Sequence, residues 1–596
     1  MSHAVVRGEP TLAQKHLDVV LDACLRARGV QPSREARARV SIAQLMLHCM
    51  REKPDFVFMI NGATKEHITN RTMLELSIPL ARKLLVQGLK GKTMMLVARD
   101  HERTVALYVA MLLAGVVTYL TDPGCTKFEL QYYLRLVEPS LVCCDEATQE
   151  TVADAVADTA DVNTDVLHLD TNEFMEYIKE YSDDIDSFTV PDAEMYSPVL
   201  MLPTSGSTGM PKAALYNGQA LVSTLPVQWM HYKRFPTPTE RAMILTTPQW
   251  GTFTIMLTTC VVYNITLVMS PKEATVENVL DMMLTCKPTW TFFGPPFAKK
   301  LTKVATPEHF SSLETVLTLG SQVTPDILAA LKEKMRPDTN VLDGYGMTEV
   351  HSFVTIMEPG AEPGCNGKCA NIFDFKLVKD DNKLAGTDEE GELYIKGSTI
   401  IKGYHKNDTE LAASMTADGW LRTGDEFRQD RERRLYYRRR IKFCFKYDNQ
   451  LNDSELAASM TADGWLRTGD EFRQDRERRL YYRRRIKFCF KYNNQLVSPE
   501  ELEKVIGQVE NVAECVVSDS ERGPAAAVVL RARTGSDGAV RQAIHHVVAS
   551  TLSDHKRLRG GIAFVDVLPR THTGKLHRKN AKDLIHSLIK DGVCCY

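Results

Sequence analysis

The residues with the clearest chemical pattern run from Thr204 to Lys212 and read TSGSTGMPK. Glycine lets backbone N–H groups come close to an anion, the Ser and Thr hydroxyls add donors, and Lys212 adds a positive charge. The stretch is therefore typical of a loop that binds phosphate, and a flexible Gly/Ser turn ahead of a helix is the structural alternative. It is not a Walker loop, because the lysine follows Gly209 by three residues and neither Ser nor Thr comes after it.

Four further motifs follow this loop along the chain. They read DGYGMTE from Asp343, GELYIKG from Gly391, GWLRTGD from Gly419 and PRTHTGK from Pro569. In this order the five motifs resemble those of the adenylate-forming superfamily, which includes acyl-CoA synthetases, 4-coumarate:CoA ligases, beetle luciferases and the adenylation domains of peptide synthetases. The resemblance covers about residues 40 to 590, nearly the whole chain.

The resemblance implies an ATP-dependent carboxylic acid:CoA ligase. Such an enzyme forms an acyl-adenylate with Mg²⁺ and ATP and then passes the acyl group to the thiol of coenzyme A. The acid would be a medium- or long-chain fatty acid or an aryl acid. Catalysis would rest on charge placement and alignment, which is why the motifs carry donors and cations and no dedicated nucleophile.

The same resemblance assigns roles to individual residues. Residues expected to bind the phosphates are Thr204, Ser205, Gly206, Ser207, Thr208, Gly209 and Lys212. Glu349 would hold Mg²⁺, which prefers carboxylate oxygen, and Thr348 would donate to the α-phosphate. Residues expected to pack against adenine and the acyl group are Gly344, Tyr345 and Gly346, with Gly320 and Ser321 as a second wall. Lys575 would bridge the carboxylate and the α-phosphate during adenylation, and Lys491 would serve thioester formation.

A tandem duplication occupies residues 407–451 and 452–496. The two blocks of 45 residues differ only at Thr409/Ser454 and Asp448/Asn493. Each carries an aspartate suited to the two ribose hydroxyls, Asp425 or Asp470, and an arginine 15 residues later, Arg440 or Arg485. Two nearly identical units inside a non-repetitive chain do not make a solenoid.

Two arrangements of the copies are possible. In a hybrid, the first copy completes the large domain and the second runs into the small domain, so that Asp425 works with Lys491. In the alternative, the first copy is looped out whole and Asp470 works with Arg485. We favour the hybrid, although the second copy keeps intact the spacing from its GWLRTGD motif to the expected interdomain hinge at residues 484–487.

Several positions depart from the family pattern. The hinge, usually Asp-Arg-x-Lys, has Arg484 in place of the acid. The family's Lys-Tyr-Lys-Gly reads Lys491-Tyr492-Asn493-Asn494, so the glycine that follows the thioester-side lysine is replaced by asparagine. Asparagine tolerates the left-handed backbone region, so the turn there is expected to survive. A tryptophan, Trp250, stands in the loop that commonly carries a pocket histidine, which weighs against the second hypothesis, a luciferase-like adenylating monooxygenase. A third hypothesis is a catalytically impaired nucleotide-binding relative.

The elements that must position these motifs alternate between helix and strand. Apolar strands such as 93–98, 140–145 and 199–203 alternate with helical patterns over the first 300 residues, and the segment after Lys212 is able to form a helix. Short strands follow residue 365, and helices and strands alternate again from Ser498. The arginine-rich stretch RERRLYYRRR in each copy is read as a charged hairpin rather than as a polyanion site.

The sequence thus predicts an α/β fold: a large N-terminal domain of helix-covered, mostly parallel sheets with a small β-barrel-like subdomain, followed by a small mobile α+β domain. The large AMP-binding domain is expected over residues 1–430 and the small C-terminal one over 485–596. The two duplicated segments span the junction.

Composition limits the possible classes of function. The chain has 596 residues, 44% hydrophobic and 25% charged, with a net charge of −3, which argues against a nucleic-acid binder. Its 14 cysteines form no regular framework, and neither a signal peptide nor an integral membrane span is expected. We expect an intracellular, cytoplasmic enzyme of small-molecule acids, since the chain ends in GVCCY and not in the peroxisomal Ser-Lys-Leu.

Overall fold

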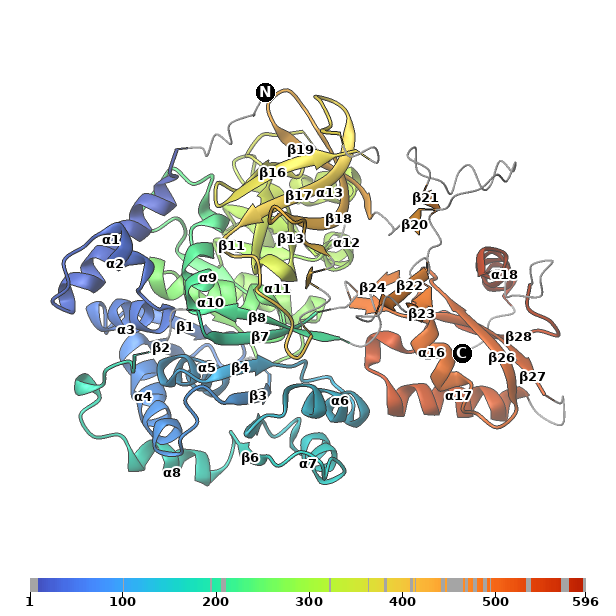
Figure 1. Cartoon of the computed structure of the whole chain (residues 1–596), viewed down its shortest axis with the longest axis horizontal. Coiled ribbons are helices and arrows are strands. Elements are labelled where there is room, and N and C mark those ends of the chain that lie inside the picture. Colours follow the sequence, from blue (N-terminus) through green and yellow to red (C-terminus); the bar gives the residue numbers. More distant parts are fainter. Residues whose placement is uncertain are drawn as a thin grey trace.

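The computed structural model describes most of the chain. The described ranges are 9–99, 101–192, 196–204, 211–320, 323–362, 364–379, 383–407, 411–412, 414–440, 445–446, 465–466, 470–474, 480–485, 490–493, 495–531, 537–569 and 578–592. Within these ranges the sequence forms a large domain and a smaller one that docks beside it (Figure 1). No helix of the described residues is long and apolar enough to cross a membrane.

The first sheet of the large domain has six strands in the order β6-β5-β3-β4-β7-β8. All neighbours are parallel except β7 and β8, which form an antiparallel hairpin. The strands are β3 Thr93–Val97, β4 Val117–Leu120, β5 Leu141–Cys144, β6 Asp165–His168, β7 Pro198–Thr204 and β8 Lys212–Asn217. The helices of this region are α4 Asn70–Val86, α5 Glu102–Ala114, α6 Lys127–Val137, α7 Gln149–Ala157 and α8 Asn172–Glu180.

The second sheet has thirteen strands, in the order β16-β17-β18-β19-β15-β14-β13-β12-β11-β9-β10-β1-β2. Its parallel half consists of β1 Val57–Asn61, β9 Arg241–Met243, β10 Thr266–Met269, β11 Trp290–Phe293, β12 Thr315–Thr318 and β13 Asn340–Met347, with β2 His67–Thr69 at the edge. Its antiparallel half consists of β14 Ser352–Ile356, β15 Gly367–Cys369, β16 Phe373–Val378, β17 Glu390–Gly397, β18 Leu421–Gln429 and β19 Arg434–Arg440.

Strand β13 belongs to both halves. Its first residues, up to Asp343, pair in parallel with β12, and from Gly344 onward it pairs antiparallel with β14. The sheet therefore changes from parallel to antiparallel inside the DGYGMTE motif.

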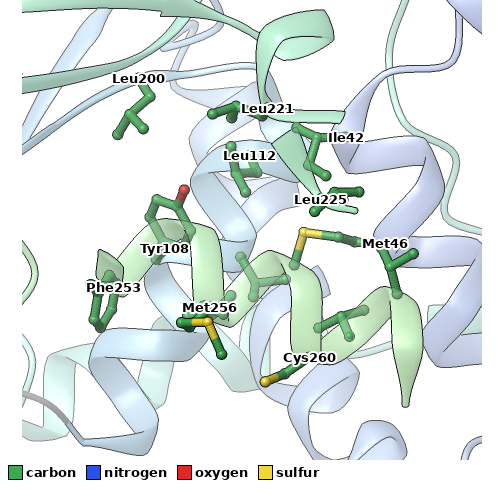
Figure 2. Close-up of a cluster of buried hydrophobic side chains, with 14 of the residues drawn as sticks. Ile42, Met46, Tyr108, Leu112, Leu200, Leu221, Leu225, Phe253, Met256 and Cys260 are labelled. Carbon is green, nitrogen blue, oxygen red and sulfur yellow. The ribbon is translucent and has the colours of Figure 1, made fainter. Parts of the chain in front are cut away.

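Two helices lie in the interior of the large domain. Every residue of α5 from Thr104 to Ala114 is buried, as is every residue of α10 (Gly251–Tyr263) from Phe253 onward. Figure 2 shows side chains of both helices packing against residues from α3 (Ile42–Glu52) and α9 (Gly218–Thr224). Helices that are apolar on all sides are buried in this way. Together they join the two sheets into one hydrophobic core.

The remaining helices of the large domain complete its outer layers. They are α1 Leu12–Ala27, α2 Arg34–Ala38, α11 Val276–Cys286, α12 Pro295–Val304 and α13 Pro325–Lys334.

The small domain begins with the hairpin β24 (Phe490–Tyr492) and β25 (Gln495–Val497), which packs against its core through Phe490, Tyr492 and Val497. Its sheet has the order β26-β27-β28, with β26 Val512–Ser518, β27 Ala525–Leu530 and β28 Gly561–Phe564. Its helices are α16 Pro499–Ile506, α17 Asp537–Thr551, the 3-10 turn η6 Asp554–Lys556, and α18 Arg578–Lys590. This architecture confirms the predicted α/β class with a small α+β domain.

The two copies of the duplicated segment occupy different places. Strands β18 and β19 of the first copy lie in the thirteen-stranded sheet, between β17 and β15. The second copy forms its own two-stranded sheet from β22 (Asp470–Gln474) and β23 (Leu480–Arg485). Both hairpins have the same register and the same irregularity, since Asp425 pairs with Arg440 as Asp470 pairs with Arg485. Two short strands lie between these hairpins, β20 (Phe445–Lys446) and β21 (Trp465–Leu466).

Candidate active site

The glycine-rich loop connects the two strands of the β7–β8 hairpin. Thr204 ends β7, Lys212 begins β8, and the two residues are register partners at the neck of the loop. The residues between them that were assigned to phosphate, Ser205, Gly206, Ser207, Thr208 and Gly209, lie outside the described residues. The helix considered possible after Lys212 is wrong for residues 212–217, which form a strand, because they pair antiparallel with β7. The helix begins only at Gly218.

One tyrosine connects Lys212, an expected phosphate ligand, to Glu349, the expected metal ligand. The Lys212 Nζ atom lies 5.1 Å from the centroid of the Tyr404 ring, and the Tyr404 hydroxyl donates a 2.9 Å hydrogen bond to Glu349 Oε1. The Glu349 carbonyl in turn accepts a 2.9 Å bond from the Ile401 N–H. Tyr404 was not among the residues predicted from the sequence, since a lone tyrosine in KGYH carries no pattern of spacing or charge.

Buried side chains contact the turn that carries Thr348 and Glu349 and hold it in place. The Tyr216 hydroxyl donates a 2.6 Å hydrogen bond to the Thr348 carbonyl, and the Tyr216 ring lies 4.8 Å from that of His351. His351 Nε2 is 2.6 Å from Thr254 Oγ1 of α10. Burial lowers the pKa of His351 to about 3, so its ring is neutral near pH 7. His351 therefore has a structural role and connects this turn to α10.

Tyr345 and Asp425 meet although 80 residues separate them. The Tyr345 hydroxyl donates a 2.6 Å hydrogen bond to Asp425 Oδ2. Asp425 is only 4% exposed, and Phe427 and Tyr437 pack around the Tyr345 ring. The structure thus joins the expected adenine-side tyrosine to the expected ribose-side aspartate, and the aspartate is that of the first copy. Arg440 pairs with Asp425 across the β18–β19 ladder.

The glycines of the GYG motif are required by close packing. A Cβ atom on Gly346 would lie 2.6 Å from the Ser352 carbonyl oxygen of the adjacent strand, and one on Gly344 would lie 3.3 Å from the Phe353 ring. The first distance is shorter than any non-bonded contact permits, so β13 and β14 can approach here only without a side chain. The backbone of Tyr345 is thereby held in place between them.

The small domain brings one predicted residue to this site. Lys491 of β24 donates a 2.6 Å hydrogen bond to the carbonyl oxygen of Gly320, which follows β12 in the large domain. In the hairpin turn that follows, Asn493 adopts a left-handed backbone conformation with a φ of 50°, while Asn494, which stands in place of the family glycine, lies outside the described residues. The wall residue Ser321 lies outside the described residues.

Other predicted residues are not brought to the site. Asp470 and Arg485 lie in the separate β22–β23 sheet. Lys575 lies outside the described residues, as do all positions from 570 to 577.

The loop with Trp250 contacts the domain interface. Gln249 Nε2 donates a 2.8 Å hydrogen bond to Asp122 Oδ2, and Gln495 Nε2 of the small domain lies 3.5 Å from the same oxygen. Burial raises the pKa of Asp122. In the loop where the resemblance led us to expect a pocket histidine, the chain therefore has an amide group and an indole.

The described part of the site fits MgATP. Thr204 Oγ1 is buried and has no hydrogen-bond partner among the described residues. This is expected of a hydroxyl whose acceptor is a bound anion. Glu349 offers carboxylate oxygen, and no group of three or more His, Cys, Asp or Glu side chains forms a metal cage in the described ranges. Mg²⁺ usually binds through one or two carboxylates together with substrate phosphates and water. The Glu349 carboxylate, near a glycine-rich loop that ends at Lys212, fits that chemistry.

Known proteins match along both domains. Residues 47–405 match the AMP-binding enzyme family, and residues 501–575 match the AMP-binding enzyme C-terminal domain. The chain is 26% identical over 553 residues to luciferin 4-monooxygenase of Photuris pensylvanica, covering 88% of this chain and 91% of that protein. It is 25% identical over 523 residues to acyl-CoA synthetase 7 of Caenorhabditis elegans, covering 83% and 85%.

Solved structures share the fold. An o-succinylbenzoate CoA synthetase from Bacillus subtilis superposes with a TM-score of 0.69 at 20% identity, over 91% of this chain and 98% of that one. Because the family match spans more than half of the chain and a second match covers the small domain, the chain belongs to the AMP-binding enzymes of the adenylate-forming superfamily.

Proposed function

We propose that the protein is an ATP-dependent carboxylic acid:CoA ligase that forms an acyl-adenylate and then an acyl-CoA thioester. The substrate is a medium- or long-chain fatty acid or an aryl acid. The observation that carries the proposal is the placement of Lys491 from the small domain on the Gly320 carbonyl, on the expected acyl and adenine wall. A lysine supplied by the small domain suits a second half-reaction, in which the thiol of coenzyme A attacks the acyl group.

The residues around the site have separate tasks in this proposal. Thr204 and Lys212 bind phosphate oxygens with a hydroxyl and a charge, and the glycine-rich loop adds backbone donors. Glu349, held by Tyr404, supplies an oxygen ligand to Mg²⁺, which neutralises charge on the phosphates when it is bound. Asp425, oriented by Tyr345, accepts hydrogen bonds from the ribose hydroxyls. Lys575 reaches the carboxylate and the α-phosphate during adenylation.

The first copy supplies the aspartate in this proposal, and the second copy supplies Lys491. This is the hybrid arrangement. It is supported by the position of β18 and β19 in the large sheet and of β24 in the core of the small domain.

A luciferase-like monooxygenase is the second candidate, favoured by the similarity to the Photuris pensylvanica enzyme. Gln249 and Trp250 weigh against it, because neither an amide nor an indole can act as a general base and take a proton from a bound substrate.

The test is ATP–pyrophosphate exchange against a panel of fatty and aryl acids, followed by loss of free thiol when coenzyme A is added. We expect exchange with at least one acid and stoichiometric thioester. Exchange with no thioester, but with light or CO₂ from a luciferin, would support the monooxygenase instead. ATP binding with no exchange on any acid would indicate the impaired relative.

Glu349→Gln is expected to lower the exchange rate by about 100-fold, because it removes the charge that holds Mg²⁺ while keeping the size of the side chain. Lys575→Ala is expected to lower the same rate. The matched control is Glu358→Gln, which breaks an ion pair with Lys368 outside the site and should leave exchange unchanged. An unchanged rate in Glu349→Gln would contradict its assignment as the metal ligand.

A further inference from the structure

A buried ion pair joins the two domains at a distance from the expected site. Helix α6 of the large domain lies beside α17 of the small domain (Figure 1). It also contacts the turn η6, through Lys556. Glu129 Oε1 of α6 is 3.0 Å from Lys556 Nζ of η6, and the same nitrogen is 3.1 Å from Glu501 Oε1 of α16. Glu129 is 7% exposed and Lys556 is 8% exposed, so water is almost excluded from the pair.

Further hydrogen bonds surround the pair. Ser553 donates to the Glu129 carboxylate through its hydroxyl, and Thr126 Oγ1 donates 2.9 Å to the Thr551 carbonyl. Glu129 also accepts a 3.0 Å bond from the Thr126 N–H, as part of the capping box that begins α6. Displacing one domain against the other would leave a buried charge without its partner, which is costly, so the contact favours one relative position of the two domains.

Both members of the pair are charged in the docked state. Burial opposes the ionisation of Glu129, but Lys556 and the Ser553 hydroxyl outweigh it, so the pKa of Glu129 is below its usual value. Burial likewise opposes the charge of Lys556, and Glu129 and Glu501 outweigh it, so the pKa of Lys556 is raised. If the domains separated, the large-domain carboxylate and the small-domain ammonium would each lose this partner.

The element that carries Lys556 is tied to the hairpin that carries Lys491. The turn η6 packs against β25, and β25 pairs with β24 at Lys491↔Leu496. Gln495 of β25 reaches Asp122, and α16 with Glu501 begins directly after this hairpin. These elements share one hydrophobic core, which links the segment that carries Lys556 to the hairpin that carries Lys491.

We propose that Glu129, Lys556 and Glu501 form an interdomain latch that positions Lys491 at the Gly320 carbonyl, and that the latch serves thioester formation but not adenylation. This rests on the proposed CoA ligase function. Glu129 and Lys556 are positioning residues, since neither contacts the expected site. The latch holds one orientation of the small domain, and a different orientation brings Lys575 to the site.

The test separates the two half-reactions. Glu129→Gln and Lys556→Met are compared with the unaltered chain for ATP–pyrophosphate exchange and for thioester formation from separately prepared acyl-adenylate and coenzyme A. We expect thioester formation to fall at least about tenfold, the change that 1.4 kcal/mol represents, with exchange within about twofold. Lys127→Met is the matched control, because Lys127 lies on the same helix as Glu129 but forms an exposed pair with Asp158 at the end of α7, so its loss should change neither rate.

Equal loss in both half-reactions would show that the pair only stabilises the fold, and an unchanged thioester rate would also overturn the latch. Glu129→Gln keeps the hydrogen-bonding capacity of the side chain, so it remains informative if Lys556→Met fails to fold.

A second readout does not depend on activity. Hydrogen–deuterium exchange should rise in both variants at residues 491–497 and 551–557 and stay unchanged in Lys127→Met. If the chain shows no exchange of pyrophosphate with any acid but the deuterium result holds, the ligase proposal fails while the interdomain contact stands. If deuterium uptake does not change, the latch is wrong whatever the chain catalyses.

Discussion

At the scale of single residues, the bond between Tyr345 and Asp425 is the feature that links the nucleotide motifs. A carboxylate that is 4% exposed, with a phenol donating to it at 2.6 Å, has little freedom to rotate. The tyrosine is itself held by glycines that allow its strand to approach β14. The hydrogen bond therefore orients the carboxylate toward its proposed ligand before the ligand arrives, which lowers the entropy lost on binding.

The two aspartates of the duplication give the first residue-scale prediction. Asp425→Ala is expected to raise the KM for ATP by about 10- to 100-fold, since hydrogen bonds to a charged group contribute about 1.5–3 kcal/mol. Asp470→Ala should leave the KM unchanged, because the strand that carries it lies outside the thirteen-stranded sheet. Steady-state kinetics on both variants would measure this. The reverse result would mean that the second hairpin takes the place between β17 and β15.

At the scale of elements, Asp343 joins four strands where the sheet changes from parallel to antiparallel. Its carboxyl accepts bonds from Thr318 of β12, from the Gly344 N–H and from Asn366, at 3.2, 2.9 and 2.7 Å. Asn366 in turn accepts from the Tyr437 N–H of β19 and precedes β15. Burial raises the pKa of Asp343 from 3.8 to about 7, because these bonds only partly offset the loss of water.

This raised pKa predicts a pH dependence of stability. Between pH 3.8 and about 7 the folded chain keeps the Asp343 proton and the unfolded chain releases it. Unfolding therefore releases a proton, and this group's contribution to the free energy of unfolding falls by about 1.4 kcal/mol per pH unit across the window. This stabilisation is fully present below pH 3.8 and has been lost above about pH 7.

The measurement is urea unfolding at several pH values for the unaltered chain and for Asp343→Asn. An amide does not titrate in this range, so the stability advantage of the unaltered chain over the variant should shrink as the pH rises from 4 to 7. An advantage that stays constant or grows would contradict a raised pKa at this position.

At the scale of the whole molecule, the duplicated segment separates the large domain from the small one. Strand β19 of the first copy ends at Arg440, and β24 of the second begins at Phe490. In a chain with one copy, the corresponding strands would be only five residues apart. Each copy contains every residue needed to complete both domains, since the two differ at just two positions.

Removal of one copy is therefore expected to preserve the fold and the adenylation activity. Deleting residues 407–451 keeps Asn493 at the left-handed turn, whereas deleting residues 452–496 leaves Asp448 there and Lys446 in the place of Lys491. Shortening the connection should stabilise the chain by up to about 2 kcal/mol through the lower entropy cost of closing the loop. Thermal unfolding and ATP–pyrophosphate exchange of both deletions measure this, and loss of folding in both would show that the domains need the extra segment.

Much of the fold and of the site could be predicted from the sequence because its signals are local. Alternating helices and strands, glycines beside hydroxyls and a lysine, and an asparagine at a turn each act through residues close together in the chain. The helix predicted after Lys212 was wrong, because this ambiguous segment forms strand β8, paired antiparallel with β7 across the loop. Tertiary pairing overrides weak local preference in such segments.

The sequence by itself determined the family, the α/β class and the order of the motifs, since these follow from residue types and short spacings. Only the tertiary structure decided that Tyr404 stands between Lys212 and Glu349, that Asp425 meets Tyr345, and that Lys556 lies on Glu129. It also decided which of two nearly identical hairpins enters the large sheet. Identical segments have identical local preferences, so that choice depends on contacts with strands far away in the chain.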